Sequence, residues 1–248
     1  MSGHSKWATI KRKKAATDQA RGKVFSKYIK EITIAARQGA DPNANPRLRT
    51  AINAAKNVNM PAGNIDRAIR RGAGLEEGVH YEETQYEGYG PGGVALLVEI
   101  ATDNRNRTAG DVRHIFTKHG AALGEAGSVA YLFKPRGVIV VEKSAMGEDD
   151  LMEIVLDAGA DDVGTEGDVY EVLTPPVHFE AVKEALAAKG VHAQSADLTK
   201  IASLQVPVSE KEAESLLKLI EALEDHDDVQ KVHANFSISD ELMAKLSH

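Results

Sequence analysis

The sequence begins, over residues 2–30, with SGHSKWATIKRKKAATDQARGKVFSKYIK. This stretch holds the only Trp of the chain, Trp7, and its densest run of positive charge, Lys11–Lys14. It shows no hydrophobic periodicity before residue 22, so we expect an extended basic arm there. From Lys23 onward, apolar residues recur at helical spacing on one side of an amphipathic helix. The opposite side of that helix carries Lys23, Lys27, Lys30 and Arg37.

Positive charge is concentrated at this end of the chain. Residues 1–71 contain 16 Lys and Arg against 4 Asp and Glu, a net charge of +12, although the whole chain has a formal net charge of −7. The remaining residues therefore carry −19. A basic N-terminal part on an acidic body indicates that the N-terminal part meets a polyanion and the body does not.

Composition limits the class of protein. The 248 residues suffice for one large domain or for two to three small ones, and 42% hydrophobic with 27% charged residues is ordinary for a globular chain. The absence of cysteine excludes disulfides, thiolate metal sites and a cysteine nucleophile. No apolar run approaches the roughly 20 residues of a membrane span. A mitochondrial transit peptide is a minor alternative for the basic N-terminus, because Lys11–Lys14 is a contiguous run rather than an amphipathic pattern.

Helix signals continue beyond the first helix. Gly39 and Asp41-Pro42 end it, and Asn45-Pro46 supplies an N-cap and first-turn pair for a second helix. A third short helix is expected from Pro61 to Arg71. The Gly-rich, acidic segment Gly72–Gly78 is typical of a linker. These signals predict a small helical bundle with a basic outer surface.

The rest of the chain alternates strands and helices. After a Gly-rich turn at Tyr86–Gly93, we expect a strand at Val94–Ile100, a helix at Thr108–Lys118 and a strand at Val129–Phe133. A second unit then reads β-α-β-α-β, with room for one more strand near Asp161–Thr165. No solenoid period is visible.

The last predicted helix, Glu210–Leu223, and strand, Val229–Phe236, have no partners of their own. The first strand-rich unit lacks one helix of a closed split β-α-β layer, so we expect the last two elements to return to it. The predicted fold is α+β, an N-terminal three-helix domain followed by two α+β (split β-α-β, ferredoxin-like) domains, one inserted in the other. The expected divisions are residues 1–22 for the basic arm, 23–77 for the helical domain, 78–135 plus 205–248 for one α+β domain and 136–204 for the inserted one.

The basic arm is the first candidate nucleic-acid interface. Clustered Lys and Arg neutralise phosphates, and a nearby aromatic side chain can stack on bases. For Trp7 the alternative is a plug that pins the arm onto the helical bundle. For the helix stripe the alternative to a phosphate track is a solvated helix face. The candidate residues in these two segments are His4, Lys6, Trp7, Lys11, Arg12, Lys13, Lys14, Arg21, Lys23, Lys27 and Lys30.

The second candidate is the strand-to-helix junction Thr102–Thr108. Helix N-termini favour anions, and Arg side chains bind phosphate oxygens bidentately, so Arg105 and Arg107 are candidate polyanion contacts. The alternative is plain N-capping by Asp103 or Thr108 with solvated arginines. The glycines at 88–93 favour a tight turn over a phosphate loop, because no Lys-Ser/Thr and no helix follow them.

The sequence contains no constellation typical of an enzyme. The nine His include no HExxH motif, there is no GxSxG, and no zinc ligand set is evident without Cys. The pairs Asp149-Asp150, Asp161-Asp162 and Asp227-Asp228 are interpreted as solubilising caps, because adjacent side chains point different ways. We therefore expect no catalytic residues, no metal and no cofactor.

Several long motifs, in order, resemble the YebC/PmpR family. They are SGHSKW with the basic run, DP-x-x-NPRLR at 41–49, NMP at 59–61, YEGYGPGG at 86–93, TDNRNRT at 102–108 and GSVAYLF at 127–133. The family includes the mitochondrial translational activator of cytochrome c oxidase. The resemblance covers most of residues 2–140, and the C-terminal part matches mainly in pattern. Gly39-Ala40 stands where a Gly pair is common.

The resemblance implies a three-domain, non-enzymatic regulator of gene expression. Members are described either as DNA-binding transcriptional regulators or as ribosome-associated factors that help translation past stalls, notably at proline-rich stretches. We favour RNA on the ribosome (rRNA or tRNA) as the partner, with ribosomal proteins as further partners. DNA stays the alternative, although no clear helix-turn-helix dyad is visible. Because the GHSKW motif starts near residue 2, a bacterial cytoplasmic form is expected, with no membrane and no small-molecule substrate.

Overall fold

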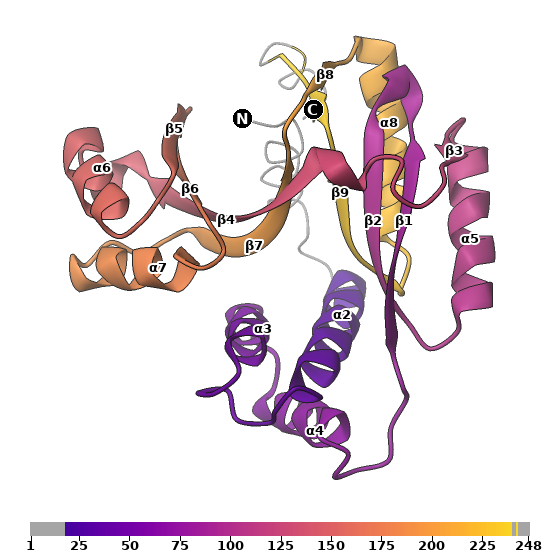
Figure 1. Ribbon diagram of the computed structural model, residues 1–248, viewed down its shortest axis with the longest axis horizontal. Helices are drawn as coiled ribbons and strands as arrows, with labels where there is room; N and C mark the ends of the chain where they lie inside the picture. The colour runs from indigo at the N-terminus through magenta and orange to yellow at the C-terminus, as the bar shows by residue number, and fades with distance from the viewer. Residues whose placement is uncertain (1–17, 240–241, 243–248) are drawn as a thin grey trace.

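The structure is a computed structural model that describes residues 18–239 and 242. Its first described part is a bundle of three helices, α2 (Asp18–Ala36), α3 (Pro46–Asn57) and α4 (Ala62–Gly72), at the bottom of Figure 1. Ile32, Leu48 and Ile65 are buried in its core. Helix α2 begins five residues earlier than Lys23, so the end of the expected arm is helical. Gln, Ala and Arg are good helix formers, and extending an existing helix through them costs little.

Two local features fix this bundle. The side chain of Asn45 caps α3 by accepting a hydrogen bond from the Leu48 N–H at 3.1 Å, and its amide donates to the carbonyl oxygens of Ala35 and Gly39 at 2.8 Å each. Gly72, the last residue of α4, lies so close to the Thr33 carbonyl that an added Cβ would overlap it. The predicted stop signal at Gly72 is thus also the point where α4 approaches the backbone of α2.

The first sheet has the strand order β3-β1-β2-β9, all antiparallel. Its strands are β1 (Glu82–Tyr89), β2 (Ala95–Thr102), β3 (Ala122–Leu123) and β9 (Val229–Ala234). Helices α5 (Arg105–Lys118) and α8 (Glu210–Glu224) cover one face (Figure 1). Phe116 of α5 and Leu216 of α8 share one core with the strands.

The prediction for this region was wrong in two places. Residues 82–89 form a strand, whereas the sequence had indicated a turn from Tyr86 onward and no element at 82–85. The Glu and Gly residues of this segment have low strand propensity and weakened the signal. Residues 129–132 are not a strand: a 3₁₀ turn occupies Ala130–Leu132, and Phe133 already begins a strand of the second sheet. The strand that pairs with β1 at this edge is the short β3. Val129 and Phe133 are nevertheless buried, against Ala95 and Leu97 on the sheet face away from α5 and α8. The apolar run is therefore explained by packing rather than by a strand ladder.

The inserted domain forms a second antiparallel sheet, with order β5-β6-β4-β7. Its elements are β4 (Phe133–Glu142), α6 (Glu148–Asp157), β5 (Asp162–Glu166), β6 (Val169–Thr174), α7 (Phe179–Ala188) and β7 (Ser195–Ala202). This β-α-β-β-α-β sequence with that strand order is the ferredoxin-like arrangement. The predicted fold class, including the insertion, is confirmed. The strand expected near Asp161–Thr165 is β5.

The long pair β4 and β7 joins the inserted domain to the rest of the molecule. Its register runs from Phe133 opposite Ala202 to Val140 opposite Ser195, so the chain leaves and returns side by side. Beyond β7, the short strands β8 (Val206–Pro207) and β10 (Phe236–Ser237) form a parallel pair. Short 3₁₀ turns lie at Pro91–Gly93 and Lys143–Ala145. No helix in the described part of the chain is long and apolar enough to cross a membrane.

Candidate nucleic-acid interface

The basic arm lies mostly outside the described residues. This applies to His4, Lys6, Trp7 and to Lys11, Arg12, Lys13 and Lys14, whose contact with nucleic acid stays a prediction. Arg21 belongs to α2, but only its backbone is described. The choice between base stacking and packing for Trp7 therefore stays open.

The basic stripe of α2 faces the end of helix α8 rather than open solvent. The Nζ of Lys23 donates to the Asp225 carbonyl at 3.2 Å, and the Nζ of Lys27 donates to the Glu224 carbonyl at 2.7 Å. These carbonyl oxygens belong to the last turn and C-cap of α8, which lack partners within the helix and form the negative end of its dipole. The lysines of one domain thus cap a helix of another. The expectation of a stripe on the outer surface is corrected for these residues.

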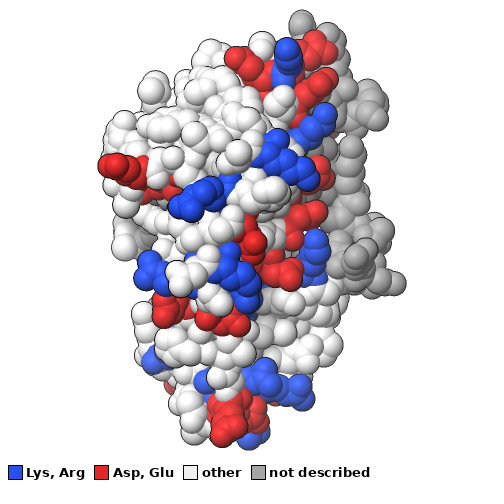
Figure 2. All heavy atoms as spheres, turned by 90° about the vertical axis from the view of Figure 1, so that its right-hand side faces the viewer, with Lys and Arg blue, Asp and Glu red and all other residues white. Residues whose placement is uncertain are grey.

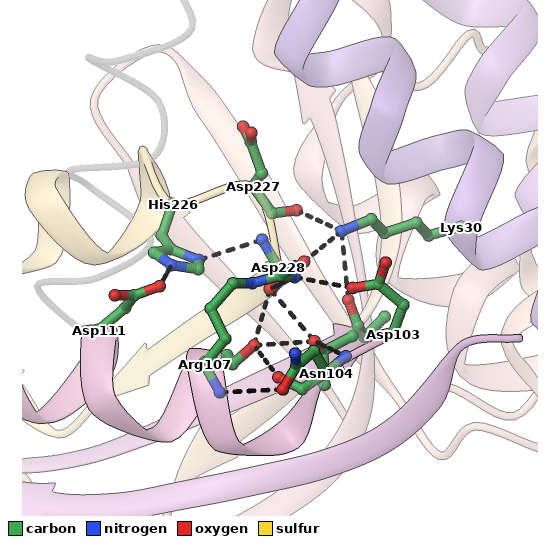
Figure 3. Close-up of polar contacts among 11 residues, drawn as sticks. Lys30, Asp103, Asn104, Arg107, Asp111, His226, Asp227 and Asp228 are labelled. Carbon is green, nitrogen blue, oxygen red and sulfur yellow. Dashed lines mark hydrogen bonds and ion pairs between the residues drawn. The ribbon is translucent and has the colours of Figure 1, made fainter. Parts of the chain in front are cut away.

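Lys30 is the most deeply placed member of the stripe. It is 8% exposed, and its Nζ lies 2.6 Å from Oδ1 of Asp228. The same ammonium group donates to the carbonyls of Asp227 at 2.9 Å (Figure 3) and Ala101 at 3.3 Å. It also lies 5.5 Å from the centre of the Tyr81 ring. All three protons of the ammonium group therefore have acceptors inside the protein.

Asp228 collects the contacts of the TDNRNRT junction as well. Its Oδ2 accepts from Arg107 at 2.8 Å, Thr108 at 2.7 Å and Thr102 at 3.2 Å. Burial opposes ionisation of this carboxyl group, but hydrogen bonds from Lys30, Arg107 and Thr108 outweigh it, so the pKa of Asp228 lies well below its usual range. The interpretation of Asp227-Asp228 as a solubilising cap is wrong for Asp228, which is 3% exposed.

The same junction caps helix α5. Asn104, and not Asp103 or Thr108, is the N-cap, and its side chain accepts from the Arg107 N–H at 3.1 Å. The Arg107 guanidinium also lies 2.7 Å from Asp103, while Arg105 is more exposed, approaches Glu82 at 3.9 Å and donates a long hydrogen bond to Thr84 at 3.5 Å. Of the two predicted arginines, Arg107 is engaged within the protein and Arg105 is largely free to meet solvent. A nucleic-acid contact by either stays a prediction.

These residues line a cleft of about 720 Å³ between the helical domain and the first sheet. Its cations are Lys23, Lys30 and Arg107, and its carboxylates are those of Asp103, Asp111, Asp225, Asp227 and Asp228. His226 lies at 3.3 Å from Asp111, and its other ring nitrogen accepts from the Asp228 N–H at 3.1 Å (Figure 3). Because carboxylates outnumber cations, the cleft is a junction between domains rather than a groove for phosphates. No metal-binding cluster of His, Asp and Glu occurs among the described residues.

A second contact between the same domains centres on Arg47, which the sequence did not single out. Its guanidinium lies 2.9 Å from Glu31 of α2 and 2.5 Å from Glu83 of β1. The hydrogen bonds with these two carboxylates raise the pKa of Arg47 above its usual value, against the effect of burial. Arg37 adds a hydrogen bond to the Tyr81 carbonyl at 2.6 Å. The basic surface expected on the bundle is thus partly used to hold the next domain.

A third ionic contact joins the two sheets. Glu99 of β2 lies 2.6 Å from Lys200 of β7 and 3.5 Å from His233 of β9. Burial opposes its ionisation, but His233 and Lys200 together lower the pKa of Glu99 to about 2. A small cleft of about 220 Å³ opens beside these residues.

Two of the sequence motifs meet at Glu87. This residue of the YEGYGPGG motif is 3% exposed, and its carboxylate accepts from the backbone N–H groups of Gly127 and Val129 at 2.7 Å each and of Ala130 at 2.8 Å. These three residues belong to the GSVAYLF motif. Burial opposes ionisation, but the three donors lower the pKa of Glu87. The glycines that follow form a turn, in which Gly92 and Gly93 both have φ of 73°, as the sequence indicated.

The exposed cations that remain lie on several surfaces. On α4, Arg67 and Arg71 are four residues apart and share the exposed side of the helix with Arg70, which pairs with Glu76 at 3.0 Å. Lys56, at the end of α3, is exposed as well. On the face that carries α5, Lys and Arg alternate with Asp and Glu, so that face has no field of a single sign (Figure 2). The exposed side of α4 thus carries three arginines beside one carboxylate, that of Asp66.

Matches to known proteins extend over nearly the whole chain. Residues 5–75 match the model of the TACO1/YebC protein N-terminal domain, and residues 81–236 match that of the TACO1/YebC second and third domain. A relative from Desulfatibacillum aliphaticivorans, named "Probable transcriptional regulatory protein", is 58% identical over 99% of this chain and 100% of its own length. A relative of the same name from Dictyoglomus thermophilum is 55% identical over 100% of both chains. The crystal structure of a conserved hypothetical protein from Aquifex aeolicus aligns with a TM-score of 0.81 and 48% identity, covering 90% of this chain and 93% of the other.

Proposed function

This chain belongs to the TACO1/YebC family, and from that premise we propose that it is a nucleic-acid-binding regulator of gene expression without enzymatic activity. The favoured target is rRNA or tRNA on the ribosome, where the protein relieves stalled synthesis, for example at proline-rich stretches. The observation that carries this proposal is the separation of charge, +12 over residues 1–71 against −19 over the rest. A polyanion is attracted to one end of such a molecule and repelled by the other.

The internal contacts divide the basic end into two sets of cations. In the first set, Lys23 and Lys27 donate hydrogen bonds to carbonyl oxygens at the C-terminal end of α8, and Lys30 donates to Asp228. The proposed phosphate contacts are therefore made first by Lys11–Lys14 of the arm, with His4, Lys6, Trp7 and Arg21 beside them. The exposed side of α4, with Arg67 and Arg71, extends this surface onto the folded bundle.

A sedimentation experiment with purified ribosomes tests this assignment. We expect Lys11, Arg12, Lys13 and Lys14 replaced by Glu to abolish cosedimentation, and Arg67→Glu with Arg71→Glu to weaken it. The matched control is Lys211→Glu with Lys218→Glu on α8, which changes charge on exposed residues of the acidic body. If about 6–10 phosphates are contacted, affinity should fall by roughly 10³–10⁵ between 50 and 200 mM salt. Cosedimentation that is insensitive to both the arm variant and salt would contradict the proposal.

DNA is the second candidate, and one structural observation favours it in addition to the names of the relatives. Helices α3 and α4 follow one another across a short turn, residues 58–61, with Asn59 at φ of 58°. Helix-turn-helix motifs have such a turn, and Asn64, Arg67 and Arg71 of α4 are polar residues of the kind that contact bases and phosphates. Crosslinking in cells followed by sequencing separates the candidates. Enriched rRNA or tRNA supports the ribosomal role, and discrete promoter DNA without RNA enrichment supports DNA.

A further inference from the structure

Helix α6 of the inserted domain leaves two large apolar side chains at the surface. On its inner side, Leu151 and Val155 are fully buried in the core of that domain. Met152 and Leu156 are four residues apart, so they lie on one side of the helix, where they are 37% and 44% exposed. We call these two side chains the α6 ridge. The helix lies at the left of Figure 1, on the opposite side of the picture from α5.

A third apolar side chain lies at one end of the ridge. Val177 is 82% exposed and comes just before α7. Gly159, three residues after Leu156, is so close to the His178 ring that an added Cβ would lie 2.8 Å from it. The C-terminal end of α6 therefore meets the start of α7, and Val177 lies at this end of the domain. Exposed apolar side chains that gather on one surface indicate a binding site more strongly than scattered ones do.

Carboxylates border the α6 ridge. Beside it on the helix runs a row of three exposed acidic residues, Asp149, Glu153 and Asp157. Within the described part of the chain, no Lys, Arg or His forms an ion pair with these three. Around them, residues 144–182 contain 11 Asp and Glu and no Lys or Arg. The ridge therefore lies in surroundings of a single, negative sign.

The stability of α6 does not account for this row of carboxylates. In the first turn, the carboxylate of Asp149 favours the helix because it lies near the positive end of the helix dipole. Asp157 is the last residue of the helix, where the dipole is negative, and the last turn contains no basic residue. A carboxylate at that position costs helix stability unless a cation from outside the chain approaches it.

An apolar ridge beside carboxylates selects the chemistry of its partner. The carboxylates repel nucleic acid and anionic lipid, and a purely hydrophilic cation leaves the ridge exposed to water. A polypeptide with Lys or Arg beside apolar side chains fits both parts of the surface. Its cations pair with the carboxylates while its apolar side chains cover Met152 and Leu156. Methionine also adapts its shape to different partners, which suits a surface of this kind.

We propose that the α6 ridge and the carboxylate row beside it bind a short, basic and amphipathic segment of a partner protein. The segment lays its apolar side on Met152 and Leu156 and its Lys or Arg side chains on Glu153 and Asp157. The surface itself stands on the exposure and charge of α6; only the placing of the partner on the ribosome rests on the proposed function. In that setting the basic N-terminal part holds nucleic acid while the acidic inserted domain holds a protein.

Fluorescence anisotropy measures the binding of a labelled synthetic peptide in which Leu recurs at helical spacing among Lys residues. A second peptide carries Ser in place of every Leu. The ridge variant is Met152→Ser with Leu156→Ser, and the charge variant is Glu153→Lys with Asp157→Lys. Each variant has a matched control at exposed residues elsewhere, Leu75→Ser with Leu204→Ser for the first and Glu214→Lys with Glu221→Lys on α8 for the second.

We expect the Lys/Leu peptide to bind the unchanged protein and both controls alike, and to bind the ridge and charge variants about tenfold more weakly. The Lys/Ser peptide should bind weakly, with no difference between the unchanged protein and the ridge variant. Equal affinity of the Lys/Leu peptide for the unchanged protein and the ridge variant overturns the proposal, as does an equal loss in the controls. So does a dimer of the protein alone, seen by size exclusion and abolished in the ridge variant, because the occupant is then a second copy of the chain.

Crosslinking on purified ribosomes then separates this surface from the proposed function. Because the chain has no cysteine, Leu156→Cys can carry a benzophenone that reacts with whatever covers the ridge, and Ala187→Cys at an exposed position of α7 is the control. We expect a crosslink from residue 156, and none from residue 187, to a Lys- and Arg-rich segment of a ribosomal protein. A crosslink from residue 156 to RNA overturns the proposal. If the peptide pattern holds but the protein does not cosediment with ribosomes, the surface stands and the proposed ribosomal function fails.

Discussion

Lys30 and Asp228 lie 198 residues apart in the chain, yet their Nζ and Oδ1 atoms are 2.6 Å apart in a buried ion pair. Lys30 comes from the helical domain, and Asp228 precedes the strand that completes the first sheet. Arg107, from the motif thought to bind a second polyanion, reaches the same carboxylate. The two basic patches predicted from the sequence thus meet, and the group between them is a carboxylate of the protein itself.

Removing Asp228 should be far more costly than removing Lys30. In Asp228→Ala, the buried ammonium of Lys30 loses its counterion, and we expect the free energy of unfolding to fall by about 3–5 kcal/mol. In Lys30→Met, Asp228 still has Arg107, Thr108 and Thr102, so the loss should be roughly half as large or less. Urea unfolding measures both, and Asp227→Ala, at an exposed neighbour, is the control. Equal losses for the two variants would show that the carboxylate has no special place in the junction.

The stability of the protein should depend on pH through Glu99. Its pKa is about 2 in the folded protein and near its ordinary value of 4.5 when unfolded, so the unfolded state binds the proton first as pH falls. The stabilisation is therefore complete above about pH 5 and is lost towards pH 2. We expect it to amount to roughly 2 kcal/mol, because the side chain is partly solvated. Glu99→Gln should remove this part of the slope, whereas Glu153→Gln on the surface of α6 should keep it. A Glu99→Gln protein with the same slope as the unchanged chain would sink the assignment.

Two glycines of helix α4 should respond to alanine with opposite signs. At Gly72 a Cβ would overlap the Thr33 carbonyl and the Ala36 side chain, so Gly72→Ala should destabilise the bundle by about 1–3 kcal/mol. At Gly63 nothing lies within 4 Å, and Gly63→Ala should stabilise the helix by roughly 0.5–1 kcal/mol. Thermal unfolding of the two variants gives the comparison. A stabilising Gly72→Ala would mean that α4 does not approach α2 as described.

Glu87 should hold residues 127–130, which follow β3, in their folded conformation. Without its carboxylate, the N–H groups of Gly127, Val129 and Ala130 lose their acceptor, and we expect Glu87→Ala to cost about 3 kcal/mol or more. Hydrogen exchange at residues 127–130 should accelerate more than elsewhere in the first sheet. Gln85→Ala, at an exposed position of the same strand, serves as the control. Unchanged protection at 127–130 would refute the clamp.

Hydrophobic periodicity, together with the Gly, Pro and capping residues at the ends of elements, was sufficient to predict the fold class. The helices of the bundle, the Asn45 cap and the stop at Gly72 follow from local signals, and these act within a few residues. The final helix and strand had no partners in sequence order, and a lone amphipathic helix must bury its apolar side. We therefore predicted that they return to the first α+β domain, which makes the second one an insertion. Strand β1 was missed because the Glu and Gly residues of EETQYEGY weaken its strand signal; in the fold, β2 pairs with its whole length and β3 with its last two residues.

The sequence by itself determined the order of the domains and the sign of their charges, because composition and helical period are properties of the chain alone. Only the tertiary structure decided which charges stay available to a partner. Lys23, Lys27 and Lys30 form a row on one side of α2, as a phosphate-binding surface would require. In the fold, however, the last carbonyls of α8 and the carboxylate of Asp228 lie within hydrogen-bond distance of these lysines. A buried ion pair depends on folding that brings opposite charges together with enough hydrogen bonds to offset the loss of water, and a separation of 198 residues leaves no local sequence pattern for it.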